Sequence, residues 1–241
     1  MDQEYSKYTD EDRKVWKTLF NRQIDNLSKI SSQEYLDGLD RIDFNAGKIP
    51  NFEDTEQRLE KYTGWKLHVV PSIIPVKDFF ELLIKRQFPA TTWLRKMSEL
   101  DYLEEPDMFH DVFGHVPLLT NDAYTGFFLG IAEISVKHLD NEYAQELLGR
   151  IYWFTIEFGL IRENGNVKAY GAGLMSSYGE SKYSMTNEPQ RFDFDVKTIL
   201  NTQFRTDIFQ DKYFIIDSYE QLYDCVPKIE QELDKMLQLQ S

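Results

Sequence analysis

Apolar residues recur every three or four positions along much of the chain, which is the spacing of one face of an α-helix. Behind a capping threonine at position 9, one such stripe predicts a first helix that packs on the core. Its members are Val15, Trp16, Leu19, Phe20, Ile24, Leu27 and Ile30. Ser31 and Glu34 stand three positions apart, as in a capping box, and predict a second helix. Residues 55–65 continue this helical first quarter.

Two short runs interrupt the helical spacing. Residues 66–70 (KLHVV) and 213–217 (YFIID) are predicted strands, whereas residues 76–88 return to a helical pattern. Residues 122–136 and 142–162 predict two longer helices. The second of these is apolar on every side around IYWFTIEFGLI, which is typical of a central helix.

The last third of the chain mixes turn signals with helical ones. Three glycines within residues 169–180 favour irregular or hairpin structure there. Ser218 and Gln221 predict the cap of a closing helix that Pro227 kinks. The predicted fold is mainly α, with packed helices and a few short strands in a single domain over residues 1–241.

Composition narrows the choice of partners. The formal net charge of -14 repels phosphate backbones and anionic lipid headgroups, so we expect neither nucleic acid nor membrane binding but a small-molecule ligand. The single Cys225 excludes an internal disulfide and a multi-cysteine zinc site, and it suits a reducing compartment such as the cytoplasm. The polar N-terminus predicts no signal peptide, and no run approaches the roughly 18 apolar residues of a membrane span.

The candidate chemistry begins with two histidines in EPDMFHDVFGHVPLL, residues 105–119. His110 and His115 are five positions apart, which on a regular helix is a rotation of about 140°. Their rings can converge only if the helix ends or distorts, as Gly114 and Pro117 favour. Neutral imidazoles in apolar surroundings are good metal ligands, but two core histidines bonded to the backbone are the alternative.

A third candidate ligand is Glu157, which lies between apolar neighbours in YWFTIEFGL. A carboxylate there needs a cation, a partner or protonation, and a salt bridge to Arg150 or Arg162 is the alternative to a metal. Two histidines and one carboxylate are the ligand pattern of non-haem iron(II) enzymes that activate dioxygen. Zinc is the rival, although zinc peptidases space their histidines four apart with glutamate after the first, where this chain has Asp111.

Three segments resemble the catalytic domain of the pterin-dependent aromatic amino acid hydroxylases: EPDMFHDVFGHVPL, IYWFTIEFGL and KAYGAGLMSSYGE. They occur in the order and spacing of that family, and the similarity runs from about Pro75 to Tyr213 with a weaker signal outside. The resemblance implies the fold of those hydroxylases and makes His110, His115 and Glu157 the iron ligands.

The resemblance also implies two binding sites. Arg95 would bind the substrate carboxylate, with Asp107 orienting its guanidinium. Four further residues match positions near the family's substrate ring: Phe88, Trp153, Gly173 and Ser176. Three match pterin-lining positions: Phe79, which would stack on the pterin, Asp111 and Tyr152. A surface arginine, core aromatics and a solvated aspartate are the alternatives.

In the reaction that the resemblance implies, iron(II) and a tetrahydropterin activate O2 to hydroxylate the ring of a free aromatic amino acid. Trp153 resembles the phenylalanine and tyrosine enzymes rather than the tryptophan enzymes, and short family members commonly convert phenylalanine to tyrosine, so this is the expected reaction. Hydroxylation of tryptophan, or of phenylalanine at the meta carbon, is the alternative. Leu103 stands where the animal enzymes have threonine after the tyrosine matched by Tyr102, which removes one hydroxyl near the substrate carboxylate.

The chain resembles the short bacterial form of the family. It leaves no room for the regulatory domain and tetramerising helix of the animal enzymes, so we expect a monomer. The single cysteine predicts that this monomer is cytoplasmic. Two hypotheses from other classes compete with this one. A zinc-dependent hydrolase would need neither pterin nor O2, and a binding protein would hold pterin or amino acid without turnover.

Overall fold

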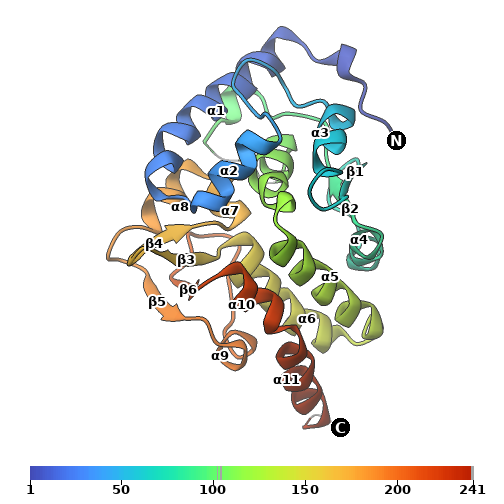
Figure 1. Cartoon of the computed structure of the whole chain (residues 1–241), viewed down its shortest axis with the longest axis vertical. Coiled ribbons are helices and arrows are strands. Elements are labelled where there is room, and N and C mark those ends of the chain that lie inside the picture. Colours follow the sequence, from blue (N-terminus) through green and yellow to red (C-terminus); the bar gives the residue numbers. More distant parts are fainter. Residues whose placement is uncertain (102, 104, 240–241) are drawn as a thin grey trace.

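The structure is a computed structural model that describes residues 1–101, 103 and 105–239. Helices dominate it, and short strands gather in two small sheets (Figure 1). This architecture confirms the predicted fold class, a mainly α protein with a few short strands.

The elements follow one another along the chain with short connections. In order they are α1 (Asp10–Ile30), α2 (Gln33–Arg41), α3 (Phe52–Leu59), β1 (Lys66–Val69), α4 (Val76–Ile84), β2 (Gln87–Ala90), α5 (Asp122–Lys137), α6 (Glu142–Tyr152), β3 (Leu160–Glu163), β4 (Asn166–Ala169), α7 (Ala172–Ser176), α8 (Tyr178–Tyr183), β5 (Gln190–Asp193), α9 (Val196–Leu200), β6 (Lys212–Ile216), α10 (Tyr219–Asp224) and α11 (Val226–Gln238). Short 3₁₀ helices cover Tyr5–Lys7, Met97–Glu99 and Val116–Thr120, and π-helices cover Phe109–His115 and Trp153–Glu157.

Helix α1 begins where the sequence predicts it. The Thr9 hydroxyl accepts a hydrogen bond from the backbone N–H of Asp12, whose carboxylate accepts one from the backbone N–H of Thr9. The second predicted cap is wrong by one residue, because Ser32 caps α2 while the Ser31 hydroxyl bonds back to the Leu27 carbonyl in α1. Only one of two adjacent serines can face the next helix, and the sequence does not distinguish them.

Two predicted helices have different bounds in the structure. Helix α3 starts earlier than residue 55, because the side chain of Asn51 caps it, and it ends at Leu59. The predicted helix 76–88 ends early: α4 stops at Ile84, and Gln87 already belongs to β2. The main chain turns between these elements at Arg86, whose φ is 55°, a left-handed conformation that breaks a helix. Strand β2 then pairs in parallel with β1, which confirms the strand predicted at 66–70.

The central segment changes its backbone structure twice. Residues 142–162 were predicted as one helix, but they form α6, a π-helix and then β3. Residues 169–180 were predicted as irregular or hairpin structure, but they contain the end of β4, all of α7 and the first half of α8. The glycines there serve close packing instead, since a Cβ on Gly171 would lie 2.3 Å from the Glu157 carbonyl oxygen.

The four-stranded sheet has the order β4-β3-β6-β5. Strands β3 and β4 form an antiparallel hairpin closed by Asn164 and Gly165, both at positive φ, while β6 runs parallel to both of its neighbours. Strand β6 confirms the prediction at 213–217. The closing helix is divided into α10 and α11, with Pro227 in the first turn of α11, where its missing N–H leaves no hydrogen bond unmade.

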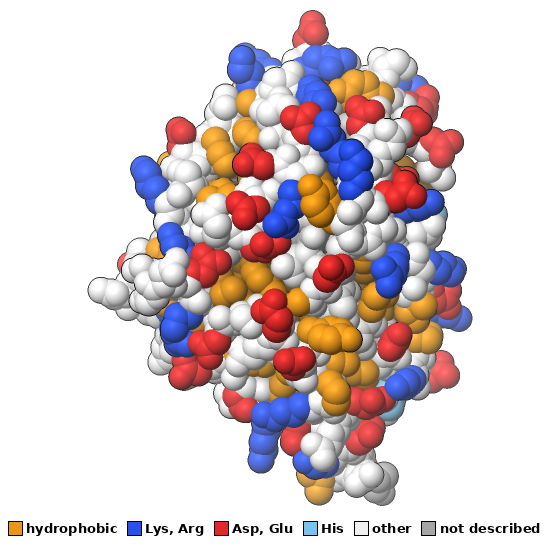
Figure 2. Space-filling model, in the orientation of Figure 1, with side chains coloured by type: hydrophobic (Ala, Val, Ile, Leu, Met, Phe, Trp, Pro, Cys, Tyr) orange, Lys and Arg blue, Asp and Glu red, His pale blue; other side chains and the backbone are white. Residues whose placement is uncertain are grey.

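One cluster of buried apolar side chains runs from Val15 in α1 to Leu233 in α11 and joins the helices and the four-stranded sheet. Acidic side chains are spread over the face drawn in Figure 2, with lysines and arginines between them. In the part of the chain that the structure describes, no helix combines the length and the apolar character needed to cross a bilayer. Helix α7 contacts both π-helices, so the fold brings parts of residues 105–119, 153–158 and 169–180 together.

Candidate active site

The two candidate histidines lie on one side of a π-helix, Phe109–His115. In such a helix each backbone N–H bonds to the carbonyl five residues earlier, so side chains five positions apart lie one above the other. The ring centroids of His110 and His115 are 5.2 Å apart, with the planes at 85°. The predicted distortion of the helix is confirmed, and its widened turn explains how this spacing brings both rings to one place.

Glu157 ends a second π-helix, Trp153–Glu157. The backbone N–H of Phe158 donates to the Trp153 carbonyl, five residues back, at 2.9 Å. This turn directs the Glu157 carboxylate at the histidines: Oε1 lies 3.2 Å from Nε2 of His115, and Oε2 lies 3.7 Å from Nε2 of His110. π-Helical turns are rare and occur often at functional sites, and here two of them supply all three candidate ligands.

The three side chains form a donor set that suits a metal ion. One ligand atom from each of His110, His115 and Glu157 lies within 4.8 Å of the other two. Donors bound at right angles, each about 2.1 Å from an ion, are roughly 3 Å apart, so small side-chain movements would close the set around a metal. Two neutral imidazoles and one carboxylate suit iron(II), with zinc as the chemical rival. The residues present therefore fit a metal site.

The Glu157 carboxylate is held in its ionised form. Burial on its own raises its pKa, but the charge and hydrogen bond of His115, the charge of His110 and a hydrogen bond from Tyr152 lower the pKa to about 2. Simple protonation is therefore not how the protein accommodates this carboxyl group.

The two arginines that could have neutralised Glu157 are bound elsewhere. Arg150 pairs with Glu146 on its own helix and donates to a backbone carbonyl of α9. Arg162 binds two aspartates on the outer side of the four-stranded sheet. The alternative of a salt bridge from Glu157 to Arg150 or Arg162 is therefore wrong. His115, His110 and Tyr152 are the described groups that lower the pKa of its carboxyl group.

Ser176 fixes the orientation of His110. Its hydroxyl donates to the Ala172 carbonyl at 2.9 Å and lies 2.8 Å from Nδ1 of His110. A hydroxyl has one hydrogen, so a serine that donates to a carbonyl must accept from the imidazole. In its neutral form His110 is then protonated on Nδ1, and the lone pair of Nε2 faces Glu157 and is free for a metal. Ser176 was predicted to lie beside the substrate, and the structure shows that it also contacts the candidate metal ligand His110.

Arg95 and Asp107 form a buried two-pronged ion pair. Nε and Nη2 of Arg95 donate to the two carboxylate oxygens of Asp107 at 2.9 and 2.8 Å, and the Arg95 backbone N–H adds a third bond at 2.9 Å. Asp107 is fully buried, and its Oδ1 also accepts from the backbone N–H of His110 at 3.2 Å. The surface-arginine alternative is wrong, because Arg95 is only 9% exposed. The pair ties this guanidinium to the helix that carries the histidines.

The aromatic residues predicted near the substrate ring lie around the triad. The Phe88 ring is 4.8 Å from the His115 ring, centroid to centroid. The indole of Trp153 is 4.7 Å from the ring of Phe158, which directly follows Glu157 in the chain. A Cβ on Gly173 would lie 2.7 Å from that Phe158 ring, so glycine permits α7 to pack against it. Phe88 therefore lies beside His115 and Gly173 beside the Glu157 backbone, while Trp153 is connected to the triad through Phe158.

The three predicted pterin-lining residues form a second group. The rings of Phe79 and Tyr152 meet edge to face, with centroids 5.7 Å apart. A hydrogen bond from Tyr152 lowers the pKa of Glu157. Burial raises the pKa of Tyr152, and the charge of Asp111 raises it further. Asp111 is not a freely solvated carboxylate: it accepts two 2.8 Å hydrogen bonds from Thr91, and burial raises its pKa. The sequence thus named residues that the fold brings together beside the triad.

Three neighbours of the site were missed by sequence reasoning. Phe158 and Phe204 both contact the Trp153 indole, and Gln210 accepts a hydrogen bond from its Nε1 at 2.9 Å. Phe204 and Gln210 are about fifty residues from Trp153 along the chain, so no local pattern relates them. Phe158 is adjacent to Glu157, and its aromatic character was the one available signal.

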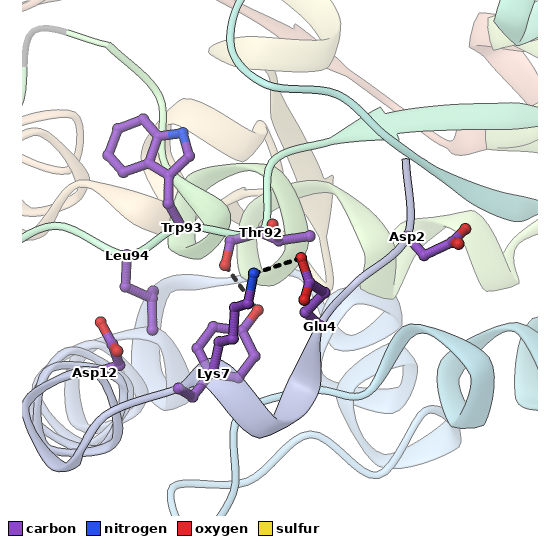
Figure 3. A pocket seen from close by; sticks show the side chains of 8 residues that line it. Asp2, Glu4, Lys7, Asp12, Thr92, Trp93 and Leu94 are labelled. Carbon is purple, nitrogen blue, oxygen red and sulfur yellow. Dashed lines mark hydrogen bonds and ion pairs between the residues drawn. The ribbon is translucent and has the colours of Figure 1, made fainter.

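A surface pocket with a volume of about 270 Å³ lies outside this site (Figure 3). Tyr8, Thr92 and Leu94 belong to its lining, which among the described residues includes none of the three candidate ligands. The Tyr8 hydroxyl donates to the Thr92 carbonyl at 2.7 Å and so anchors the segment that leads into Arg95.

Leu103, which replaces a threonine of the animal enzymes, is half-buried, and Tyr102 beside it lies outside the described residues.

A mainly helical chain with a two-histidine, one-glutamate site and a buried arginine beside it defines a class of metal-dependent enzyme. A family model described as biopterin-dependent aromatic amino acid hydroxylase matches residues 4–241, so the chain belongs to that family. The match extends well beyond the segment from Pro75 to Tyr213 that carried the resemblance.

Individual relatives support this assignment. The phenylalanine-4-hydroxylase of Chromobacterium violaceum is 43% identical over 226 residues, which cover 92% of this chain and 75% of that protein. The tyrosine 3-monooxygenase of Rattus norvegicus is 34% identical, over 90% of this chain and 44% of that protein. A crystal structure of the Chromobacterium violaceum enzyme, with bound iron(III) and 7,8-dihydrobiopterin, superposes with a TM-score of 0.91 at 41% identity, covering 98% of this chain and 86% of that one. The predictions of family, fold class and pterin-dependent hydroxylase activity are confirmed.

Proposed function

We propose that the protein hydroxylates free phenylalanine to tyrosine, using iron(II) held by His110, His115 and Glu157 together with a tetrahydropterin and O2. The convergence of these three ligand atoms within 4.8 Å carries the proposal. The likeness to phenylalanine-4-hydroxylases over more than nine-tenths of the chain supports the choice of substrate.

When bound, the metal and the reduced pterin would supply the electrons and the site for activating O2, one atom of which would enter the substrate ring. The protein's own residues bind and orient. Glu157 gives the metal an anionic ligand, and Ser176 keeps Nε2 of His110 unprotonated. Three protein ligands would leave further coordination positions of a bound iron(II) open to other molecules.

Substrate orientation falls to the Arg95 guanidinium. Asp107 occupies one edge of that planar group, so the remaining N–H donors can bind the carboxylate of an amino acid. This pair fixes one end of the substrate, and the aromatic shell of Phe88, Trp153 and Phe158 surrounds the other. A ring fixed at both ends presents one carbon to the metal, which favours a single product.

The pterin would lie against Phe79, with Tyr152 and Asp111 beside it. A half-buried phenyl ring is a suitable surface for a flat heterocycle, and a carboxylate is a suitable acceptor for its N–H groups.

We further propose that residues 1–241 act as one catalytic domain, as a monomer and in the cytoplasm. The continuous core from α1 to α11 and the single, buried Cys225 support this view.

The test is a substrate panel of phenylalanine, tyrosine and tryptophan with tetrahydropterin and O2, after anaerobic loading with iron(II) or with zinc. We expect tyrosine from phenylalanine only in the iron-loaded protein, and little product from the other two amino acids. Activity that persists with zinc and without pterin would favour the hydrolase hypothesis. Tight amino acid binding without any hydroxylated product after iron loading would favour the binding-protein hypothesis.

A further inference from the structure

The Trp153 indole is restrained on three sides. Its ring stacks on Phe204, with centroids 4.5 Å apart and planes at 17°, and it meets Phe158 at 4.7 Å. Its Nε1–H donates to Oε1 of Gln210 at 2.9 Å. The stacked Phe204 ring makes no directional bond that fixes the indole within its own plane, whereas a hydrogen bond at one edge opposes movement in that plane. Among the described residues, Gln210 therefore supplies the one hydrogen bond that orients this ring.

The amide of Gln210 can face the indole in only one orientation. Its Nε2 donates to the backbone carbonyls of Arg205 at 2.7 Å and Ile208 at 3.2 Å. Carbonyls only accept and an indole N–H only donates, so the amide nitrogen must face the carbonyls and the oxygen must face Trp153. Gln210 is 4% exposed, and exchanging its oxygen and nitrogen would leave three buried contacts without a matching donor or acceptor.

The backbone of Gln210 is held as firmly as its side chain. Its N–H donates to Oε1 of Glu180 at 2.8 Å, and the Tyr213 hydroxyl donates to the same oxygen at 3.1 Å. Glu180 lies in α8 and is largely buried, as is Tyr213 in β6. Gln210 thus joins α8 and the start of β6 to the aromatic wall of the site.

We propose that Gln210 is a positioning residue that fixes the plane of the Trp153 indole and thereby sets which aromatic side chain the site accepts. The proposal rests on the proposed function, because it takes Trp153 to line the substrate ring. Gln210 touches neither the metal ligands nor Arg95 in the hydrogen bonds described above, so its effect on the reaction must pass through the indole. A more mobile indole widens the pocket for the substrate ring. This weakens the binding of phenylalanine and favours the larger side chain of tryptophan.

The first test needs no enzyme activity. In the full chain with ¹⁵N-labelled tryptophan, Trp153→Phe identifies which indole N–H signal belongs to Trp153. Gln210→Met keeps the length of the side chain but removes the acceptor, so this signal is expected to move upfield, and its exchange with solvent is expected to quicken by about fivefold, the equivalent of one neutral hydrogen bond. An unchanged signal would overturn the contact on which the proposal depends.

The matched control is Gln145→Met. The Gln145 amide also bridges two backbone carbonyls, of Ser135 and His138, at 2.9 and 3.0 Å, but it lies at the junction of α5 and α6 and has no bond to Trp153. A general loss of stability would affect both variants, whereas a change confined to the Trp153 signal is expected only from Gln210→Met.

The second test compares substrates in a double-mutant cycle on iron-loaded protein. Gln210→Met is expected to raise the KM for phenylalanine about fivefold with a smaller change in kcat, and to lower the ratio of kcat/KM for phenylalanine over tryptophan by a similar factor. Phenylalanine at position 153 has no N–H, so in the Trp153→Phe background the same substitution should change this ratio less than about twofold.

Equal effects of Gln210→Met in both backgrounds, or the same ratio change from Gln145→Met, would overturn the proposal. Failure of the proposed function gives a different result: the wild type would form no hydroxylated amino acid, while the indole signal would still report whether Gln210 orients Trp153.

Discussion

Replacing Ser176 by alanine should weaken metal binding without removing a ligand. The wild-type hydroxyl accepts from Nδ1 of His110 at 2.8 Å, which keeps the proton off the Nε2 atom that faces Glu157. Alanine leaves the ring free to rotate and to carry its proton on either nitrogen. Loss of such an outer contact to a ligating histidine typically costs 10- to 100-fold in metal affinity, or about 1.4 to 2.8 kcal/mol. We expect a decrease within this range.

The assay is anaerobic titration of the metal-free protein with iron(II), following the bound metal by equilibrium dialysis. Ser181→Ala is the matched control, because that buried serine also accepts from a side chain, that of Asn26, and donates to a backbone carbonyl, but it lies in α8 away from the triad. Iron affinity that is unchanged in Ser176→Ala, or equally lowered in Ser181→Ala, would refute the reasoning from the tautomer of His110.

Three further predictions follow from other contacts. Arg95→Lys replaces a planar fork by a single ammonium that cannot bind Asp107 and a substrate carboxylate together, so the KM for phenylalanine should rise roughly 10- to 100-fold in steady-state kinetics; an unchanged KM would remove Arg95 from substrate binding. Phe79→Ala removes the ring that meets Tyr152 and should raise the KM for tetrahydropterin several-fold more than that for phenylalanine, and the reverse order would misplace the pterin. Burial raises the pKa of Glu180 from 4.5 to about 7, so its protonated form favours the folded state, and that stability is present below about pH 4.5 and lost as the pH rises through 7. Denaturant unfolding at several pH values should therefore show the free energy of unfolding of wild type falling by roughly 3 kcal/mol relative to Glu180→Gln between about pH 5 and pH 8, and parallel curves would contradict this assignment.

The sequence was most informative where a residue type can be accommodated by the fold in only a few ways. A glutamate among apolar neighbours and two histidines in an apolar segment need partners, and the fold brings these three side chains together. Helix α1 was predictable for a similar reason, since a capping threonine and a regular apolar stripe act on the same residues.

The parts that could not be predicted depend on backbone geometry and on distant neighbours. In the two π-helices each backbone N–H bonds to the carbonyl five residues earlier, whereas in an α-helix it bonds to the carbonyl four residues earlier. The spacing of side chains in the sequence does not distinguish the two patterns. The segment 169–180 contains glycines because its helices pack against the Glu157 backbone, whereas the same glycines in isolation favour turns. Gln210 reaches Trp153 through the tertiary fold, and neither residue carries a local sign of the other.

The most direct test of the account is the fate of molecular oxygen. Iron-loaded wild type and Glu157→Ala are supplied with phenylalanine, tetrahydropterin and ¹⁸O2, and the hydroxylated product is identified by mass and retention. We predict tyrosine carrying one ¹⁸O atom from the wild type and none from the variant, because the variant lacks the anionic ligand of the triad. Labelled tyrosine formed equally well by Glu157→Ala, or tyrosine whose new oxygen comes from water, would contradict the assignment of the metal site and of the reaction.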